Sequence, residues 1–180
     1  MTQKNYNTQE VRKQDSAHCM HPFADTKSLA SRSARIITHG DGIDVYDSNG
    51  AKILDAMSGL WCVNMGYGQK SLIDAATEQM TTLPFYNSFF NTTTPPSVEL
   101  AALLAEVAPE GFNHVFYSSS GSESNDTNLR MVRRYWDVKG QPQRKTIISR
   151  INGYHGSTVA GASLGGMIGM HEQGDLPIPG

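Results

Sequence analysis

The chain has 180 residues, and 15 Lys and Arg against 17 Asp and Glu give a formal net charge of −2. This length predicts about one domain with a core of its own. The charge balance, with no basic stripe, excludes a general binder of nucleic acid. No apolar run reaches the roughly 18 residues of a membrane-spanning helix, and residues 1–20 have no apolar stretch typical of a secretory signal.

The two cysteines, Cys19 and Cys62, lie far apart in the sequence and form no Cys-x-x-Cys pattern. This spacing disfavours both a disulfide framework and a zinc site. We therefore expect no metal site, and two reduced thiols in a cytoplasmic protein.

The first third of the chain is predicted to be largely irregular. Residues 1–16 are polar and predict a mobile arm with one or two helical turns. Residues 18–23 contain a proline and predict a loop. Asn49-Gly50, with alternating apolar residues on both sides, is a strong signal for a β-hairpin.

The middle of the chain is predicted to contain one helix between two irregular segments. Residues 60–68 are apolar but interrupted by glycine, which favours a loop lined with large side chains. Residues 71–80 have helical periodicity, with Ser71 as the expected cap. Residues 84–94 are aromatic and rich in Asn and Thr, so they are expected to be irregular.

The last part of the chain predicts alternating helices and strands. Residues 95–107 predict a helix, because proline opens the segment and a leucine stripe follows. Residues 115–118 predict a strand, residues 122–138 a helix and residues 146–149 a second strand. This order is typical of a parallel α/β layer, so we expect the α/β fold class.

A serine-rich turn between the first of these strands and its helix is the strongest candidate for a binding site. Ser118–Ser120 and Ser122 surround Gly121, and the helix follows at once. The unpaired N–H groups and positive dipole end of a helix bind anions such as phosphate. The acids Glu123 and Asp126 would have to point away from such a ligand. The alternative is an ordinary helix cap in a serine-rich loop.

The loop at residues 152–158 follows the next predicted strand. In open α/β sheets, ligands gather at the carboxyl ends of strands, where both this loop and the serine turn would lie. Tyr154 could lie flat against a planar cofactor, and His155 could bond or stack beside it. The alternative is a turn with a buried tyrosine and a histidine bonded within the protein.

Residues 161–165 match the Gly-x-Ser-x-Gly pattern of serine hydrolases, with Ser163 as the nucleophile. That pattern needs a strand before the serine and a helix after it. Small residues precede this segment, and a glycine-rich stretch follows it. His171 is the one later candidate base, and it is too near for the usual order. We keep the hydrolase as an alternative function.

Taken together, these motifs resemble the N-terminal part of the class III (omega) aminotransferases, which are fold-type-I enzymes that use pyridoxal 5'-phosphate (PLP). Within this family the match favours the amine–pyruvate and putrescine–pyruvate transaminases. The resemblance implies an N-terminal arm and hairpin segment over residues 1–60, and the first, incomplete part of the large mixed-sheet PLP domain over residues 61–180. It extends over His21-Pro-Phe23 and the segments 54–68, 83–90, 117–136, 152–167 and 171–180.

The resemblance also implies cofactor-binding residues. Ser120, Gly121 and Ser122 match the segment that holds the phosphate of PLP, and Tyr154 and His155 match residues beside its pyridine ring.

The implied substrate pocket is aromatic. Phe23, Trp61 and Tyr154 match residues around the substrate, and Phe89 matches a residue that enters the pocket from the partner subunit. The family therefore implies a homodimer with shared active sites. Aromatic walls suit apolar amine side chains, which gain free energy on burial.

The implied activity moves an amino group from an amine or ω-amino acid to pyruvate or a similar 2-oxo acid, through PLP and pyridoxamine phosphate. Such chemistry needs a Schiff-base lysine. Lys145 is the last lysine of the sequence and precedes the tyrosine loop. We therefore expect the catalytic lysine to lie beyond the chain end, and the 180 residues alone to be an inactive truncation or partial record. Ile151 also departs from close relatives, with no consequence assigned.

A second alternative is a non-catalytic fragment that contacts a partner protein through the aromatic residues at 85–90.

Overall fold

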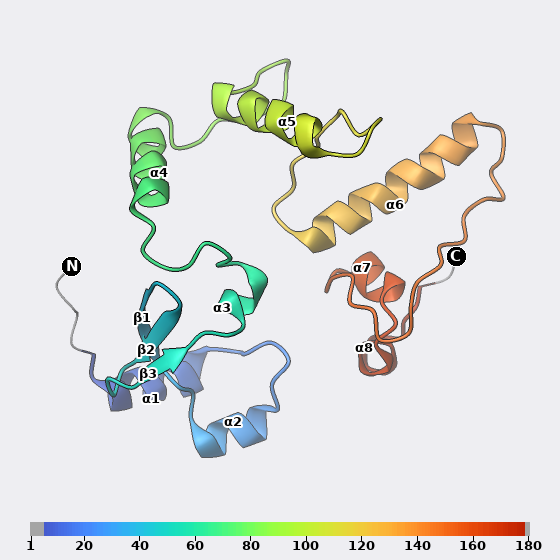
Figure 1. Ribbon diagram of the computed structural model, residues 1–180. Coiled ribbons are helices and arrows are strands. Elements are labelled where there is room, and N and C mark those ends of the chain that lie inside the picture. Colours follow the sequence, from blue (N-terminus) through green and yellow to red (C-terminus); the bar gives the residue numbers. More distant parts are fainter. Residues whose placement is uncertain (1–5, 179–180) are drawn as a thin grey trace. The chain divides into compact units, whose positions relative to one another are not determined.

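The computed structural model describes residues 6–178 (Figure 1). The chain divides into two compact units after Asn87. Unit 1 ends at Asn87, and unit 2 begins at Ser88. These units group residues that lie near one another in this chain, whereas the boundary predicted after residue 60 concerns the domains of the resembled family. That domain boundary stays a prediction.

Unit 1 begins with two helices, α1 (Thr8–His18) and α2 (Thr26–Arg32). The Asn7 side chain caps α1 by accepting hydrogen bonds from the backbone N–H groups of residues 9 and 10. Helix α1 is longer than the one or two turns predicted for the arm, and residues 1–5 of that arm lie outside the described residues. Helix α2 was not predicted.

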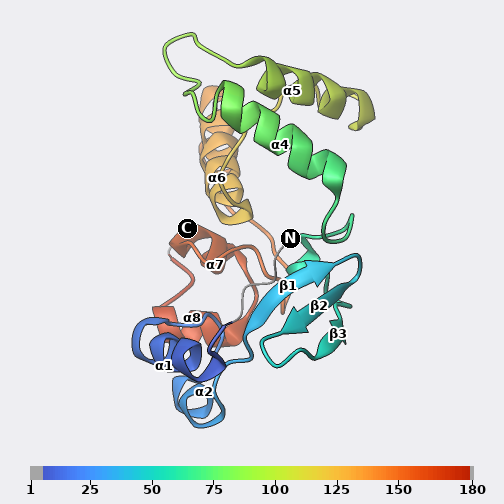
Figure 2. The same ribbon diagram turned by 90° about the vertical axis from the view of Figure 1, so that its left-hand side faces the viewer.

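A three-stranded antiparallel sheet follows, formed by β1 (Ile37–Asp41), β2 (Asp44–Asp47) and β3 (Lys52–Leu54) in that order (Figure 2). The hairpin predicted at Asn49-Gly50 is confirmed, since it joins β2 to β3. Asp47 Oδ1 accepts hydrogen bonds from Asn49 N (2.9 Å) and Ala51 N (3.0 Å). Gly50 supplies the positive φ of 82° that this turn requires.

Two further helices complete unit 1: α3 (Ser58–Trp61) and α4 (Lys70–Thr82). Helix α3 overlaps the loop predicted at 60–68, and it is a single turn whose four residues all have φ between 48° and 65°. Helix α4 confirms the helix predicted at 71–80. Ser71 lies inside that helix and is not its cap, because the helix begins one residue earlier.

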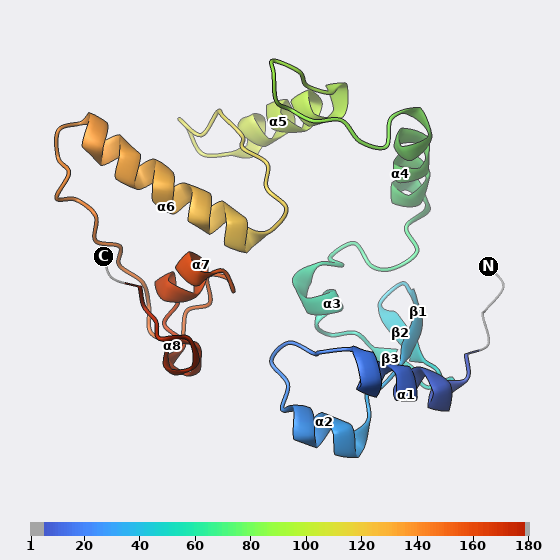
Figure 3. The same ribbon diagram turned by 180° about the vertical axis from the view of Figure 1, so that it is seen from behind.

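Unit 2 contains four helices among its described residues. Helix α5 (Pro95–Val107) begins with proline, as predicted, and α6 (Gly121–Val138) begins one residue before the predicted helix. The segment after α6 returns to α7 (Val159–Leu164), which packs against α6, and α8 (Ile168–Gly174) packs against α7 (Figure 3). The sequence analysis predicted no secondary structure in the region of these two short helices.

The two strands predicted at 115–118 and 146–149 are absent from the described part of the chain, and so is the parallel layer. A strand exists only where a neighbouring strand supplies hydrogen bonds to its backbone. No other described segment pairs with these two. The architecture is therefore mixed α/β with an antiparallel three-stranded sheet. Residues 144 and 145 nevertheless contact α6 through their side chains. Arg144 Cζ lies 4.3 Å from the ring centroid of Trp136, and Lys145 forms an ion pair with Asp137.

The buried core of the structure is much smaller than the core that we expected from the length of the chain. Among the described residues, Ala162 is the one buried hydrophobic residue, and glycines 156, 161 and 165 of unit 2 are buried as well. Large apolar side chains on α4, α5 and α6 lie exposed, including Leu103 and Met131. Exposed apolar helix faces of this extent are typical of surfaces that contact other parts of a protein.

Candidate functional site

Helix α6 begins with an ordered cap that leaves donors available. Ser120 is the N-cap, and its Oγ accepts a hydrogen bond from Glu123 N at 3.2 Å. The hydroxyl proton of Ser120 therefore remains free to donate. The N–H groups of Gly121 and Ser122 have no acceptor among the residues that the structure describes. These N–H groups and the helix dipole favour an anionic ligand.

The acidic residue in this first turn is hydrogen-bonded to the backbone just before the helix cap. Glu123 Oε2 accepts a hydrogen bond from Ser119 N at 2.9 Å, so its carboxylate is bonded to the segment that precedes the cap. Ser118 and Ser124 bond each other through their hydroxyls, and Ser124 Oγ also donates to Ser120 O at 3.1 Å. The serine cluster thus divides into two residues that brace the turn and two, Ser120 and Ser122, that flank Gly121.

The loop at 152–158 lies against the same helix end. Asn125 Nδ2 donates a hydrogen bond to His155 O at 2.7 Å. Ser157 N donates to Ser122 Oγ at 3.1 Å, and Thr158 Oγ1 donates to Asp126 Oδ1 at 2.8 Å. The structure therefore brings the two predicted motifs together within unit 2.

Sequence reasoning missed Asn125, Thr158 and the bonded role of Asp126. One signal could have revealed the first and the last: residues 125 and 126 are three and four positions after Ser122, so all three lie on one face of α6. Nothing local in the sequence links this face to residues 155–158.

The predicted aromatic residues lie in both units. Phe23 and Trp61 belong to unit 1, and Phe89 and Tyr154 belong to unit 2. All four side chains are between 54% and 79% exposed. Each unit therefore presents aromatic rings at its own surface, as a binding site for apolar groups requires.

Trp61 ends the left-handed turn α3, which one carboxylate stabilises. Asp55 Oδ2 accepts hydrogen bonds from Tyr67 Oη at 2.6 Å and from Gly59 N at 2.7 Å. The Tyr67 hydrogen bond, followed by that of Gly59, holds the pKa of Asp55 below its ordinary value. The same bond raises the pKa of Tyr67. Left-handed residues cost about 1–2 kcal/mol each, and these bonds help to offset that strain.

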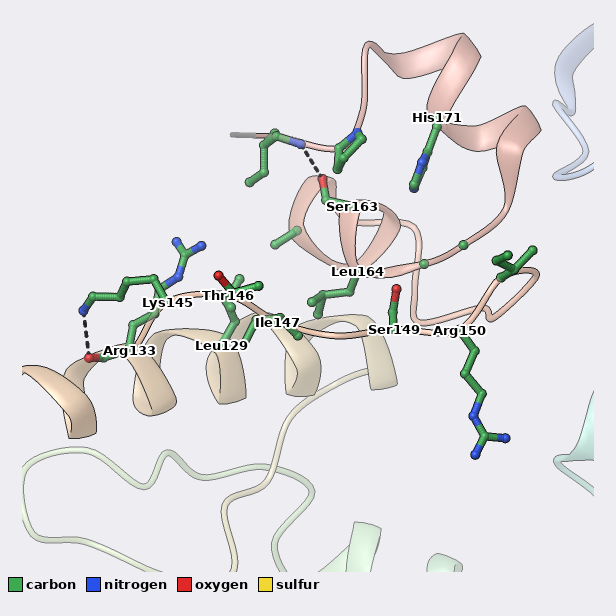
Figure 4. Close-up of a pocket in the computed structure, with 16 residues that line it drawn as sticks. Leu129, Arg133, Lys145, Thr146, Ile147, Ser149, Arg150, Ser163, Leu164 and His171 are labelled. Atoms are coloured by element: carbon green, nitrogen blue, oxygen red, sulfur yellow. Dashed lines mark hydrogen bonds between the residues drawn. The ribbon is translucent and has the colours of Figure 1, made fainter. Parts of the chain in front are cut away.

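The geometry does not support Ser163 as a nucleophile. Ser163 Oγ donates to Val159 O at 2.6 Å and accepts from Ile178 N at 3.1 Å, while His171 Nε2 lies 3.1 Å from Ala162 O. Both residues line a cavity of about 510 Å³ (Figure 4), but they come to it from α7 and α8 without bonding each other. A nucleophile and its base need a direct hydrogen bond.

No cluster of three or more metal-ligating side chains occurs within residues 6–178. Over the same described range, no helix has the length and apolar character needed to cross a membrane.

The chain is similar to known aminotransferases over nearly its whole length. It is 62% identical to putrescine–pyruvate aminotransferase of Pseudomonas aeruginosa over 176 residues, which are 98% of this chain and 39% of that protein. It is 47% identical over 145 residues to vanillin aminotransferase of Capsicum annuum, covering 80% of this chain and 32% of that protein. The chain thus spans less than half the length of these relatives.

Solved structures of omega transaminases are also similar to this chain. The omega transaminase from Pseudomonas jessenii in complex with PMP has a TM-score of 0.92 and 43% identity, and the match covers 94% of this chain and 38% of that one. A thermostable (S)-enantioselective omega-transaminase from Thermomicrobium roseum has a TM-score of 0.91 and 38% identity over 98% of this chain and 39% of that one. The family model for class III aminotransferases matches residues 28–177, so the chain belongs to the class III aminotransferases.

Proposed function

We propose that the protein carrying this chain is a transaminase that moves an amino group from an amine or ω-amino acid to pyruvate or a similar 2-oxo acid, with PLP as its cofactor. The observation that carries the proposal is the α6 helix start. It combines unpaired N–H groups at Gly121 and Ser122 with a bonded loop that bears Tyr154 and His155. Membership of the class III family supports the same reaction.

The residues present fit the cofactor. Ser120, Gly121 and Ser122 would hold the phosphate group, since they offer two hydroxyls and two backbone N–H groups at a positive helix end. Tyr154 and His155 would lie beside the ring. When bound, PLP supplies a conjugated ring that withdraws electrons from the carbon bearing the amine. The protein contributes position, anion binding and exclusion of water.

We propose that the lysine that bonds the cofactor lies outside these 180 residues. Lys145 Nζ donates to Arg133 O at 3.0 Å and pairs with Asp137 Oδ1 at 2.5 Å. Arg133 and Asp137 lie in the C-terminal half of α6, whereas the proposed phosphate site is at the N-terminal end of that helix. These contacts support the expectation that another lysine bonds the cofactor.

The substrate pocket is proposed to contain Phe23, Trp61, Phe89 and Tyr154. Each buried methylene of an aliphatic amine contributes about 0.8 kcal/mol against apolar surface. A flexible diamine is the donor named for the putrescine–pyruvate aminotransferase relative, and pyruvate is its acceptor. We propose the same pair of substrate classes for this protein.

A homodimer is proposed as the active form, with Phe89 entering the pocket of the second subunit. Phe85, Phe89 and Phe90 are 80%, 71% and 91% exposed. Aromatic rings this exposed are enriched at protein interfaces. The alternative of a non-catalytic chain with a contact surface at 85–90 uses the same rings but predicts no turnover.

The test is an assay of the protein expressed from its complete reading frame. With putrescine as donor and pyruvate as acceptor, we expect alanine and the corresponding aldehyde in equal amounts, together with cofactor absorbance in the purified protein. Absence of both bound PLP and alanine with every amine offered would refute the proposal. Labelling of Ser163 by a fluorophosphonate would support the hydrolase instead.

A matched pair of variants tests the phosphate site. Ser122→Ala removes a hydroxyl next to Gly121, and Ser119→Ala removes a hydroxyl that has no hydrogen bond within the described residues. We expect PLP affinity to fall about tenfold in Ser122→Ala and to stay within about twofold in Ser119→Ala. Equal affinities in the two variants would exclude Ser122 from the site.

A further inference from the structure

We infer that Asn125 and Asp126 are positioning residues that hold the loop bearing Tyr154 and His155 against the anion-binding end of α6. Asn125 bonds the backbone of His155 and Asp126 bonds Thr158, and neither bond involves a group proposed to hold the phosphate. The inference rests on the proposed function, because it concerns how the two halves of the PLP site are kept in register.

The first support is a set of three hydrogen bonds that cross from one motif to the other. Asn125 donates to His155 O at 2.7 Å, and Asp126 accepts from Thr158 Oγ1 at 2.8 Å. Ser122 accepts from Ser157 N at 3.1 Å. These bonds fix three positions along four residues of the loop, so the loop cannot rotate about any single contact.

The second support is steric. Gly156 has a φ of 127°, and a Cβ placed on it would lie 2.5 Å from Ser122 Oγ and 2.8 Å from Ser122 Cα. The loop backbone therefore lies against the helix at a distance that only glycine permits. Gly156 is also one of the few buried residues in the part of the chain that the structure describes.

The third support is that Thr158 joins the bonded loop to α7. Its Oγ1 accepts from Gly161 N at 3.2 Å while donating to Asp126. One hydroxyl thus caps α7 and bonds α6 at the same time. The loop is held at one end by α6 and at the other by the start of α7.

This arrangement has a specific consequence for a ligand that has a phosphate and a ring. The anion donors at residues 120–122 belong to α6, whereas Tyr154 and His155 belong to the loop. Loosening the loop should weaken binding of the whole cofactor but not binding of a phosphate alone. A merely structural role for Asn125 or Asp126 would weaken both together.

The experiment uses the protein from its complete reading frame and compares two probes. PLP affinity is measured by cofactor uptake, and the affinity of inorganic phosphate is measured by its competition with that uptake. We expect Asn125→Ala and Asp126→Ala to weaken PLP binding about tenfold and to leave phosphate competition within about twofold. The circular dichroism of the bound cofactor should also change, because it reports ring orientation.

Conservative variants guard against loss of folding. Asp126→Asn keeps an oxygen that accepts from Thr158, and Thr158→Ser keeps the hydroxyl, so both should bind PLP like the unmodified protein. Thr158→Val lacks the hydroxyl and should behave like Asp126→Ala. Asn128→Ala is the matched control, since Asn128 is an exposed asparagine on the same helix and its side chain has no hydrogen bond within the described residues.

The outcomes separate the inference from the proposed function. An unmodified protein that takes up no PLP would refute the proposed function, and this inference with it. An unmodified protein that binds PLP, with Asn125→Ala and Asp126→Ala variants that keep its ratio of PLP to phosphate affinity, would refute the inference alone. Equal loss of both affinities would also overturn it, because the helix end itself would then be damaged.

Discussion

Two loops of the molecule present aromatic residues, and they are held by different means. The segment from Asp55 to Tyr67 presents Trp61 and depends on one carboxylate, which accepts two hydrogen bonds. The loop at 152–158 presents Tyr154 and is held by three separate bonds to α6 and by the close approach of Gly156. The first arrangement depends on the charge of one group, whereas the second depends on shape and on several contacts.

The largest expected effect comes from breaking the shape of the second loop. Gly156→Ala combines a positive φ with a clash against Ser122, so we expect a loss of about 3 kcal/mol in the free energy of unfolding. Urea unfolding of the protein from its complete reading frame measures this. Gly169→Ala in α8 is the control, because a Cβ there meets open space. A similar loss in both variants would contradict the close packing of Gly156.

The next effect comes from removing the carboxylate of the first loop. Asp55→Ala removes the acceptor for Gly59 N, which lies within the left-handed residues 58–61, and for the Tyr67 hydroxyl. We expect limited proteolysis between residues 57 and 66 to become about tenfold faster. Asp55→Asn keeps one acceptor oxygen, so its rate of cleavage should lie between those of the unmodified protein and Asp55→Ala. Unchanged cleavage in Asp55→Ala would show that the turn holds itself.

A smaller, reversible effect should follow from acid. The pKa of Asp55 is lowered, first by the Tyr67 hydrogen bond, so its stabilising effect is complete above the ordinary value of 3.8 and is lost as the pH falls through the lower folded value. The pKa of Tyr67 is raised from 10.0, so its contribution is complete below that pH and is lost at more alkaline pH.

Trp61 fluorescence can follow this titration. A Trp136→Phe background leaves Trp61 as the sole tryptophan, since the chain has two. We expect an emission change below pH 4 that is absent in Asp55→Asn. An acid transition of the same size in both proteins would assign it to other carboxylates.

The sequence predicted well those features that are determined by neighbouring residues. The hairpin at Asn49-Gly50 follows from turn residues that tolerate positive φ, and α5 follows from its opening proline and leucine stripe. A helix cap in the serine-rich turn was one of two interpretations of that turn, and Ser120 is the cap of α6. In each case the signal and the structure lie within a few residues of each other.

Features that depend on distant residues were either predicted wrongly or not predicted. The strands predicted at 115–118 and 146–149 need partner strands, which no described segment supplies. The bonds between α6 and the tyrosine loop join residues 30 to 35 positions apart. Helix α8 was missed because two of its seven residues are glycine, which disfavours helix.

The smallest expected effect separates the two bonds of Asp55. Tyr67→Phe removes the hydroxyl that contributes most to the low pKa of Asp55. The ring itself stays in place, because Tyr67 N donates to Gly42 O at 2.7 Å and the ring lies against Gly40. The acid transition of Trp61 should therefore persist but move to higher pH, towards the ordinary pKa of an aspartate.

Tyr46→Phe in β2 is the control for this shift, because it removes a hydroxyl that is not bonded to Asp55 in the described structure. Its transition should coincide with that of the parent protein. If Tyr67→Phe also leaves the transition in place, then backbone hydrogen bonds, that of Gly59 first, lower the pKa of Asp55. The first loop would then still depend on one carboxylate, but through backbone bonds and not through the Tyr67 hydroxyl.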